Sequence, residues 1–121
     1  MPVPPAARWW RWLAPAFVAA AILVITSWPT PPMPPGQWDK VIHASAYATL
    51  GLATGWAARP GSLRAWLRLA IAVSAFGALD ELHQRWIPGR SADPFDWLAD
   101  TSGGAIGLAI MTARRTRQET E

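Results

Sequence analysis

Four long apolar runs, separated by breaks rich in proline and glycine, limit the folds open to this chain more than any other feature. A helix that crosses a bilayer needs about 20 mainly apolar residues, and each run comes close to that length. The runs cover residues 12–28, 41–58, 63–82 and 95–112. They use most of the 121 residues, which leaves room for a single domain, residues 1–121. The sequence therefore predicts an all-α membrane protein with four transmembrane helices in a compact bundle.

The breaks between the runs contain residues that end helices. Residues 29–36 include five prolines and predict a short extended linker. Residues 59–62, Arg-Pro-Gly-Ser, predict a tight turn, and Pro88 followed by Gly89 has the order of a type II turn. The first run follows basic residues, as in a signal peptide. No Ala-x-Ala-like cleavage site comes after it, so we interpret it as a retained anchor.

Tryptophan positions support the same division. The nine tryptophans are residues 9, 10, 12, 28, 38, 56, 66, 86 and 97. Each falls at or near an end of a proposed helix, and tryptophan gathers at membrane–water interfaces. The composition also disfavours a water-soluble domain, because only 16% of residues are charged, against about 25% in an average soluble protein. Without cysteine, disulfides and cysteine-ligated metals are excluded.

The distribution of basic residues predicts the orientation. Eight of them lie on the side that a four-span topology gives to both termini: Arg8, Arg11, Arg59, Arg64, Arg68, Arg114, Arg115 and Arg117. Three lie on the opposite side: Lys40, Arg85 and Arg90. Because basic residues are enriched in cytoplasmic segments, both termini are predicted to be cytoplasmic. Orientation alone accounts for the eight arginines, so the predicted partner is the lipid bilayer and no nucleic acid is expected.

Six of the eight acidic residues map to the predicted outer ends of the second, third and fourth helices. They are Asp39, Asp80, Glu81, Asp93, Asp96 and Asp100. Five other polar residues share this region: Lys40, His43, Tyr47, Gln84 and Arg90. Ionisable groups within or beside membrane helices are costly and indicate function. We therefore predict that these eleven residues form a ligand-binding site.

Helical spacing places several of these residues on shared faces. Asp39, His43 and Tyr47 recur every four residues and form one stripe. Asp80 and Gln84 share a face of the third helix by the same spacing.

On the fourth helix the acidic residues share a stripe with small residues. Asp93, Asp96, Asp100 and Gly107 lie on one face, and Gly103 and Gly107 form a pair that allows close helix approach. The acidic face is thus predicted to be the packing face, with its carboxylates directed into the bundle.

Simpler roles remain open for some of these residues. Asp39 and Asp93 could cap the second and fourth helices, the latter with Pro94 at the first helical position. His83 and Arg85 are interpreted as interfacial groups whose stems lie along apolar surface.

The order and spacing of these residues resemble a known family. The motifs are Asp39-Lys40-x-x-His43-x-x-x-Tyr47, Asp80-Glu81-x-x-Gln84, Pro88-Gly89-Arg90-x-x-Asp93-x-x-Asp96 and Gly103-x-x-x-Gly107. Together they resemble the VanZ-like family of small bacterial membrane proteins. Asp100 departs from the asparagine that the family often has at this position. The resemblance implies a multi-pass protein of the bacterial cytoplasmic (inner) membrane, in a family named for a gene linked to resistance to the glycopeptide teicoplanin.

Three functions are compatible with such a site. The first is binding of a lipid headgroup or cell-envelope precursor, with Arg90 contacting a phosphate or carboxylate. The second is a membrane-embedded hydrolase acting on an envelope lipid or peptide, in which His43, Glu81, Asp96 and Asp100 hold a divalent metal. No HExxH string or serine nucleophile motif supports it, so an enzyme is not favoured. The third is a structural or partner-binding role. The second function would require a divalent metal as cofactor. The sequence leaves the oligomeric state undetermined.

Overall fold

The computed structural model describes residues 5–29 and 38–121, and all regular structure in these ranges is helical. The elements are a 3-10 helix, η1 (Pro5–Trp12), and four α-helices: α1 (Leu13–Thr26), α2 (Trp38–Ala58), α3 (Leu63–Gln84) and α4 (Pro94–Thr120). The helical prediction is confirmed for all four apolar runs. The predicted linker at residues 29–36 lies outside the described residues except for Pro29.

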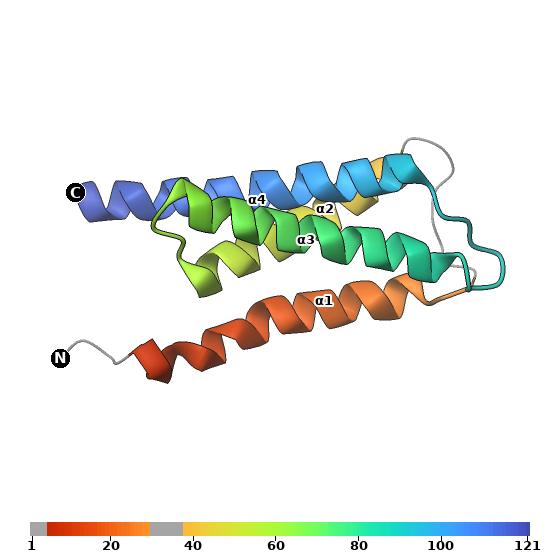
Figure 1. The fold of residues 1–121 in the computed structure, drawn as a ribbon, viewed down its shortest axis with the longest axis horizontal. Coiled ribbons are helices and arrows are strands. Elements are labelled where there is room, and N and C mark those ends of the chain that lie inside the picture. The colour runs from red at the N-terminus through yellow and green to blue at the C-terminus, as the bar shows by residue number, and fades with distance from the viewer. Residues whose placement is uncertain (1–4, 30–37) are drawn as a thin grey trace.

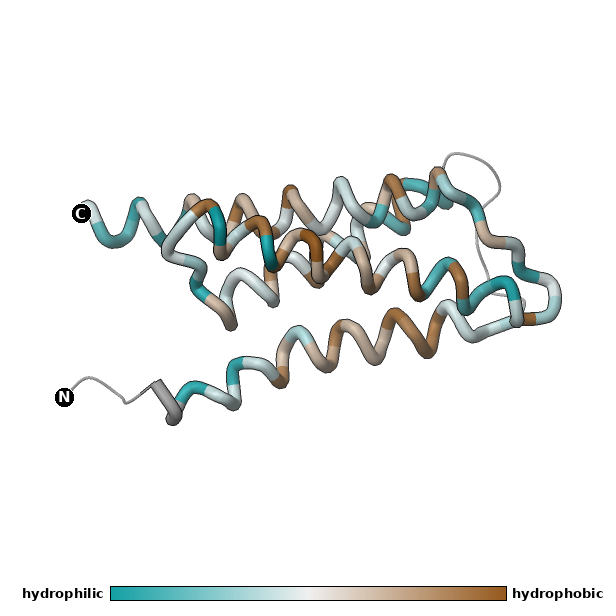
Figure 2. The backbone as a smooth tube through the Cα atoms, viewed as in Figure 1, coloured by the Kyte–Doolittle hydropathy of each residue, from teal (hydrophilic) through white to brown (hydrophobic). Residues whose placement is uncertain are grey.

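The helices run side by side along the long axis of the molecule (Figure 1). The 3-10 helix η1, the C-terminal end of α4 and the α2–α3 turn lie at one end of the bundle, which we call the arginine end. The α3–α4 connection and the start of α2 lie at the other, which we call the acidic end. Hydrophilic residues are concentrated towards both ends, whereas the middle of the helices is mainly hydrophobic (Figure 2).

Local chemistry defines where the helices begin and end. The Ser62 side chain caps α3 by accepting a hydrogen bond from the Ala65 amide at 3.1 Å. Gly89 has a φ of 78°, and the Arg90 amide donates to the Ile87 carbonyl at 3.1 Å, which agrees with the predicted type II turn.

The residue that follows α2 has an unusual backbone conformation. Arg59 has a φ of 51°, in the left-handed region that favours glycine, and its amide donates to the Gly55 carbonyl at 3.0 Å. This hydrogen bond is of the kind that ends a helix with a left-handed residue. The chain places an arginine where glycine is the usual choice.

α2 and α4 approach each other backbone to backbone. A Cβ atom added at Gly107 would lie 2.0 Å from the Ala48 carbonyl oxygen, and one at Gly103 would lie 2.1 Å from that of Ala44. On α2, a Cβ at Gly51 would lie 2.2 Å from the Gly104 carbonyl oxygen. The close approach predicted from the glycine pair on the fourth helix is therefore present, and α2 is the partner.

Polar side chains are buried in this bundle while large apolar ones face outward. The buried polar set is Thr26, His43, Thr54, Asp80, Glu81, Gln84, Asp96 and Asp100. Exposed large apolar residues occur on all four helices, for example Phe17, Val41, Ile71 and Ile106. A small core of Ile22, Tyr47, Leu50 and Val73 lies between α1, α2 and α3. A water-soluble protein normally buries its large apolar residues and exposes charge, so this arrangement is inverted.

Hydropathy alone identifies one candidate membrane span in the described residues. The segment Arg8–Thr26 contains the last part of η1 and the whole of α1, and it is long and apolar enough to cross a membrane. α2, α3 and α4 do not meet the same measure.

Candidate functional site

The structure brings the predicted site residues together at the acidic end, from α2, α3, α4 and the connection before α4. Seven are buried: His43, Tyr47, Asp80, Glu81, Gln84, Asp96 and Asp100. Four are partly exposed: Asp39, Lys40, Arg90 and Asp93. The carboxylates of α4 point into the bundle as predicted, because Asp96 is 5% exposed and Asp100 is 0% exposed.

His43 is at the centre of the cluster. Its Nδ1 atom lies 2.9 Å from Asp100 Oδ1, at hydrogen-bond distance, and 4.0 Å from Glu81 Oε1. Its Nε2 atom lies 3.8 Å from Asp39 Oδ1 and 3.8 Å from Asp96 Oδ2. The imidazole on α2 therefore joins carboxylates from α2, α3 and α4.

Lys40 neutralises part of this acidic charge. Its ammonium group pairs with Asp93 Oδ2 at 2.6 Å and with Asp96 Oδ1. The hydrogen bond from Lys40, followed by one from the Phe95 amide, lowers the pKa of Asp93 below its ordinary value. The Phe95 contact, at 2.9 Å, also makes Asp93 the N-cap of α4. The sequence leaves capping and a role in the ligand site open for Asp93, and the structure shows that it caps α4 and pairs with Lys40.

Asp39 is not the N-cap of α2, because it lies within the helix. It lies in the first turn of the helix, one residue after Trp38. Its carboxylate is partly exposed, at 33% of the side chain, and faces His43. Asp39 therefore forms the solvent-accessible edge of the cluster.

Asp80 connects the cluster to α1. The Thr26 hydroxyl donates to Asp80 Oδ1 at 2.7 Å, and the Tyr47 hydroxyl donates to Asp80 Oδ2 at 3.3 Å. The sequence interpretation did not include Thr26. The sequence feature that could have identified Thr26 is its position as a polar residue near the end of the first apolar run. That helix carried no other predicted site residue.

Glu81 links α3 to the start of α4. Its Oε2 atom accepts a hydrogen bond from the Asp93 amide at 2.9 Å, and its Oε1 atom accepts one from Gln84 at 3.2 Å. Beside it, Arg85 and Trp97 line a cavity of about 330 Å³ together with Glu81 and Asp93. Arg85 was expected to be only an interfacial group, and the structure places it at this cavity.

Arg90 does not pair with the cluster in the described part of the chain. Among residues 5–29 and 38–121 it forms no ion pair within 4.0 Å, and its buried Nε atom has no hydrogen-bond partner. The cation that contacts the acids is Lys40. The predicted contact between Arg90 and a ligand stays a prediction.

Two sets of three side chains have the spacing of metal ligands. The first is Asp39, His43 and Asp96, and the second is His43, Glu81 and Asp100. In each set the donor atoms lie within 4.8 Å of one another. Of the four predicted metal ligands, His43 belongs to both sets, Asp96 to the first, and Glu81 and Asp100 to the second. Asp39, which was not predicted as a metal ligand, belongs to the first set.

The two sets use opposite sides of the His43 ring. An ionised carboxylate can only accept, so an ionised Asp100 takes the Nδ1–H of neutral His43, and in that tautomer Nε2 keeps its lone pair. A histidine that binds a metal usually donates its other ring N–H to a carboxylate or carbonyl in this way. The geometry therefore favours the first set, Asp39, His43 and Asp96, as ligands.

Comparison with known proteins identifies the family. No curated protein and no solved structure is significantly similar to this chain. The family model described as VanZ/LLP1 matches residues 5–115, which includes every predicted site residue as well as η1 and α1. The match agrees with the resemblance carried by the motifs and extends it to the first helix. This chain belongs to the VanZ/LLP1 family.

Proposed function

We propose that this protein spans the bacterial cytoplasmic membrane four times and binds a divalent cation at its outer, acidic end. Three donor atoms would hold the ion: Asp39 Oδ1, His43 Nε2 and Asp96 Oδ2. The observation that carries the proposal is the orientation of His43 by Asp100, which leaves Nε2 facing two carboxylates. Both termini would be cytoplasmic, because the arginine end has the greater number of basic residues.

The distribution of side chains supports four spans. α2, α3 and α4 contain 21, 22 and 27 residues. At 1.5 Å per residue each is at least about 30 Å long, which matches the hydrocarbon core of a bilayer. Their mean hydropathy is lowered by polar residues that are buried inside the bundle or lie near its ends. The surface that would face lipid is apolar, and the family assignment and the apolar first helix also support a membrane protein.

The distances from His43 Nε2 to the two carboxylates suit a coordinated ion better than direct hydrogen bonds. A separation of 3.8 Å is too long for a hydrogen bond. Two ligand atoms of a zinc ion, each about 2.1 Å from the metal, lie roughly 3.4 Å apart in tetrahedral geometry. Small side-chain movements would bring the three donors into range. One imidazole and two carboxylates suit Zn²⁺ or Mn²⁺.

Such an ion would recognise an envelope ligand. An ion held by three protein atoms keeps at least one coordination position for an outside group. The partly exposed side of the site, at Asp39 and Lys40, is open to that group. The phosphate of a lipid headgroup or cell-wall precursor has the charge and the oxygen donors to bind there. Teicoplanin susceptibility of cells is then a physiological readout for the loss of this binding.

Cation titration of purified, chelator-treated protein tests the proposal. Wild type is expected to bind one Zn²⁺ or Mn²⁺ per chain by isothermal titration calorimetry. His43→Ala should abolish this binding, and Asp100→Asn should weaken it about 10-fold to 100-fold, because Asp100 orients the ligand without contacting the ion. His83→Ala is the matched control, since His83 is an exposed histidine at the same end.

Equal affinity in wild type and His43→Ala, or loss of binding in His83→Ala, would contradict the assignment. The hydrolase alternative uses the same ion and is distinguished by its product. Release of phosphate or headgroup from an envelope lipid by loaded wild type, and not by His43→Ala, would show catalysis in addition to binding.

A further inference from the structure

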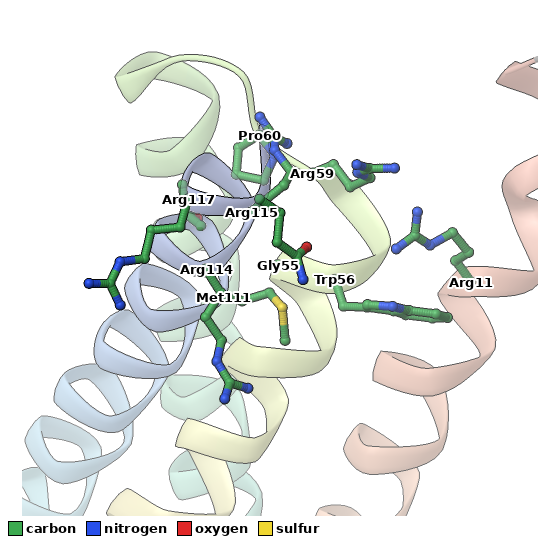
Figure 3. Close-up of a pocket in the computed structure, with 11 residues that line it drawn as sticks. Arg11, Gly55, Trp56, Arg59, Pro60, Met111, Arg114, Arg115 and Arg117 are labelled. Carbon is green, nitrogen blue, oxygen red and sulfur yellow. The ribbon is translucent and has the colours of Figure 1, made fainter. Parts of the chain in front are cut away.

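A second polar feature lies at the arginine end, opposite the cation site. A cavity of about 660 Å³ is lined there by residues of η1, α2 and α4 and of the turn after α2 (Figure 3). Its arginines are Arg11, Arg59, Arg114, Arg115 and Arg117. The volume is in the range of sites that hold small molecules or headgroups.

Acidic side chains only partly balance this charge. In the described chain, the ion pairs at this end all involve Glu119, which lies 3.1 Å from Arg115 and 4.0 Å from Arg59. Arg11 has no ion pair within 4.0 Å among the described residues, and its buried Nε atom has no hydrogen-bond partner there. The cavity thus presents guanidinium groups that an anion would satisfy.

The position of Arg11 is defined by aromatic contacts. Its guanidinium carbon lies 4.2 Å from the centre of the Trp56 ring, and Trp56 meets Trp10 edge to face at 5.6 Å. Figure 3 shows the guanidinium groups of Arg11 and Arg59 on the same side of the cavity, near Trp56. An arginine that served only as an orientation signal would need no such support.

We propose that this cavity binds a phosphate group through Arg11 and Arg59. Guanidinium groups bind phosphate oxygens in a planar, bidentate arrangement, and the cation–π contact with Trp56 positions the guanidinium group of Arg11. Two sources share this chemistry, an anionic phospholipid of the inner leaflet and free phosphate. The lipid source rests on the membrane placement proposed above, and phosphate recognition does not.

Binding to delipidated protein in neutral detergent tests the site. Phosphatidylglycerol binding is measured by native mass spectrometry and inorganic phosphate binding by calorimetry. The double variant Arg11→Gln/Arg59→Gln should weaken binding about 10-fold or more. The control Arg64→Gln/Arg68→Gln removes two charges from the same end, but neither residue lines the cavity, and it should stay within about 2-fold of wild type.

Loss confined to the cavity variant supports the site, and the ligand that shows the loss identifies the source. Equal loss in both double variants, or no binding of either ligand to wild type, overturns it. If the glutamine variant does not fold, Arg11→Lys decides, because it keeps the charge and loses the bidentate plane. Its affinity should fall, and a wild-type value contradicts the proposal. His43→Ala should leave phosphate binding unchanged, so the two sites can fail independently.

Discussion

Asp93 combines two stabilising roles in one carboxylate, and substitution separates them. Asp93→Asn should keep the N-cap of α4, because asparagine caps as well as aspartate, but lose the ion pair with Lys40. Asp93→Ala should lose both. We therefore expect melting temperatures to fall in the order wild type, Asp93→Asn, Asp93→Ala, measured by circular dichroism in detergent at pH 7.

The ion pair of Asp93 also predicts a pH dependence. Its pKa is lower in the folded protein than in the unfolded chain, so its stabilisation is complete above the unfolded value and is lost as pH falls through the folded value. The difference between wild type and Asp93→Asn should be constant from about pH 6 to pH 8 and shrink below about pH 4. A difference that persists unchanged in stronger acid would show that the ion pair contributes nothing.

The sequence predicted which residues share a face of one helix, and it did not predict every contact between helices. The stripe of Asp39, His43 and Tyr47 follows from helical spacing alone, and all three side chains face the cluster. The contact of Thr26 with Asp80 depends on how α1 lies against α3. Periodicity within one helix does not contain that information, because it requires the relative rotation of two helices.

At the scale of elements, the α2–α4 contact leaves no room for a side chain on one face of α4. Gly107→Ala should force the helices apart, because its methyl group would meet the Ala48 carbonyl at 2.0 Å. We expect a loss of about 1–3 kcal/mol or more, as for other overpacked sites. Gly61→Ala is the control, since a Cβ at Gly61 meets nothing within 4 Å, and it should change stability by less than about 0.5–1 kcal/mol.

Unfolding in detergent by a chemical denaturant compares the two alanine variants. Similar midpoints for both would mean that α2 and α4 are not in backbone contact. Leu108 is not a suitable control, although it is next to Gly107. It is 0% exposed, so its truncation would leave a cavity inside the bundle.

The C-terminal part of α4 was not predicted by the apolar pattern of the sequence. The fourth apolar run ends at residue 112, but α4 continues to Thr120. Its last eight residues include three arginines and two residues of the Glu/Gln type. These are good helix formers, so the helix extends beyond its apolar part. Hydropathy identifies the part that suits lipid and does not detect this polar extension.

At the scale of the whole molecule, the proposed topology is tested by labelling single cysteines, since the chain has none of its own. Ser91→Cys, in the exposed α3–α4 connection, should react with a membrane-impermeant maleimide in intact cells. Gly61→Cys should react only after permeabilisation. Gly61 is a better position than Ser62, because the Ser62 side chain caps α3. The reverse labelling pattern would invert the orientation and place the cation site in the cytoplasm.

The backbone of Arg59 has a conformational cost that its side chain does not relieve. A left-handed conformation costs a residue other than glycine roughly 1–2 kcal/mol, and the φ of Arg59 is 51°. Glycine would relieve this cost at the end of α2, as it does at many helix ends. Backbone stability alone would therefore favour glycine at this position. The strained backbone at Arg59 therefore holds in place a guanidinium group that lines the cavity at the arginine end, so the conformational cost and the proposed phosphate contact belong to the same residue.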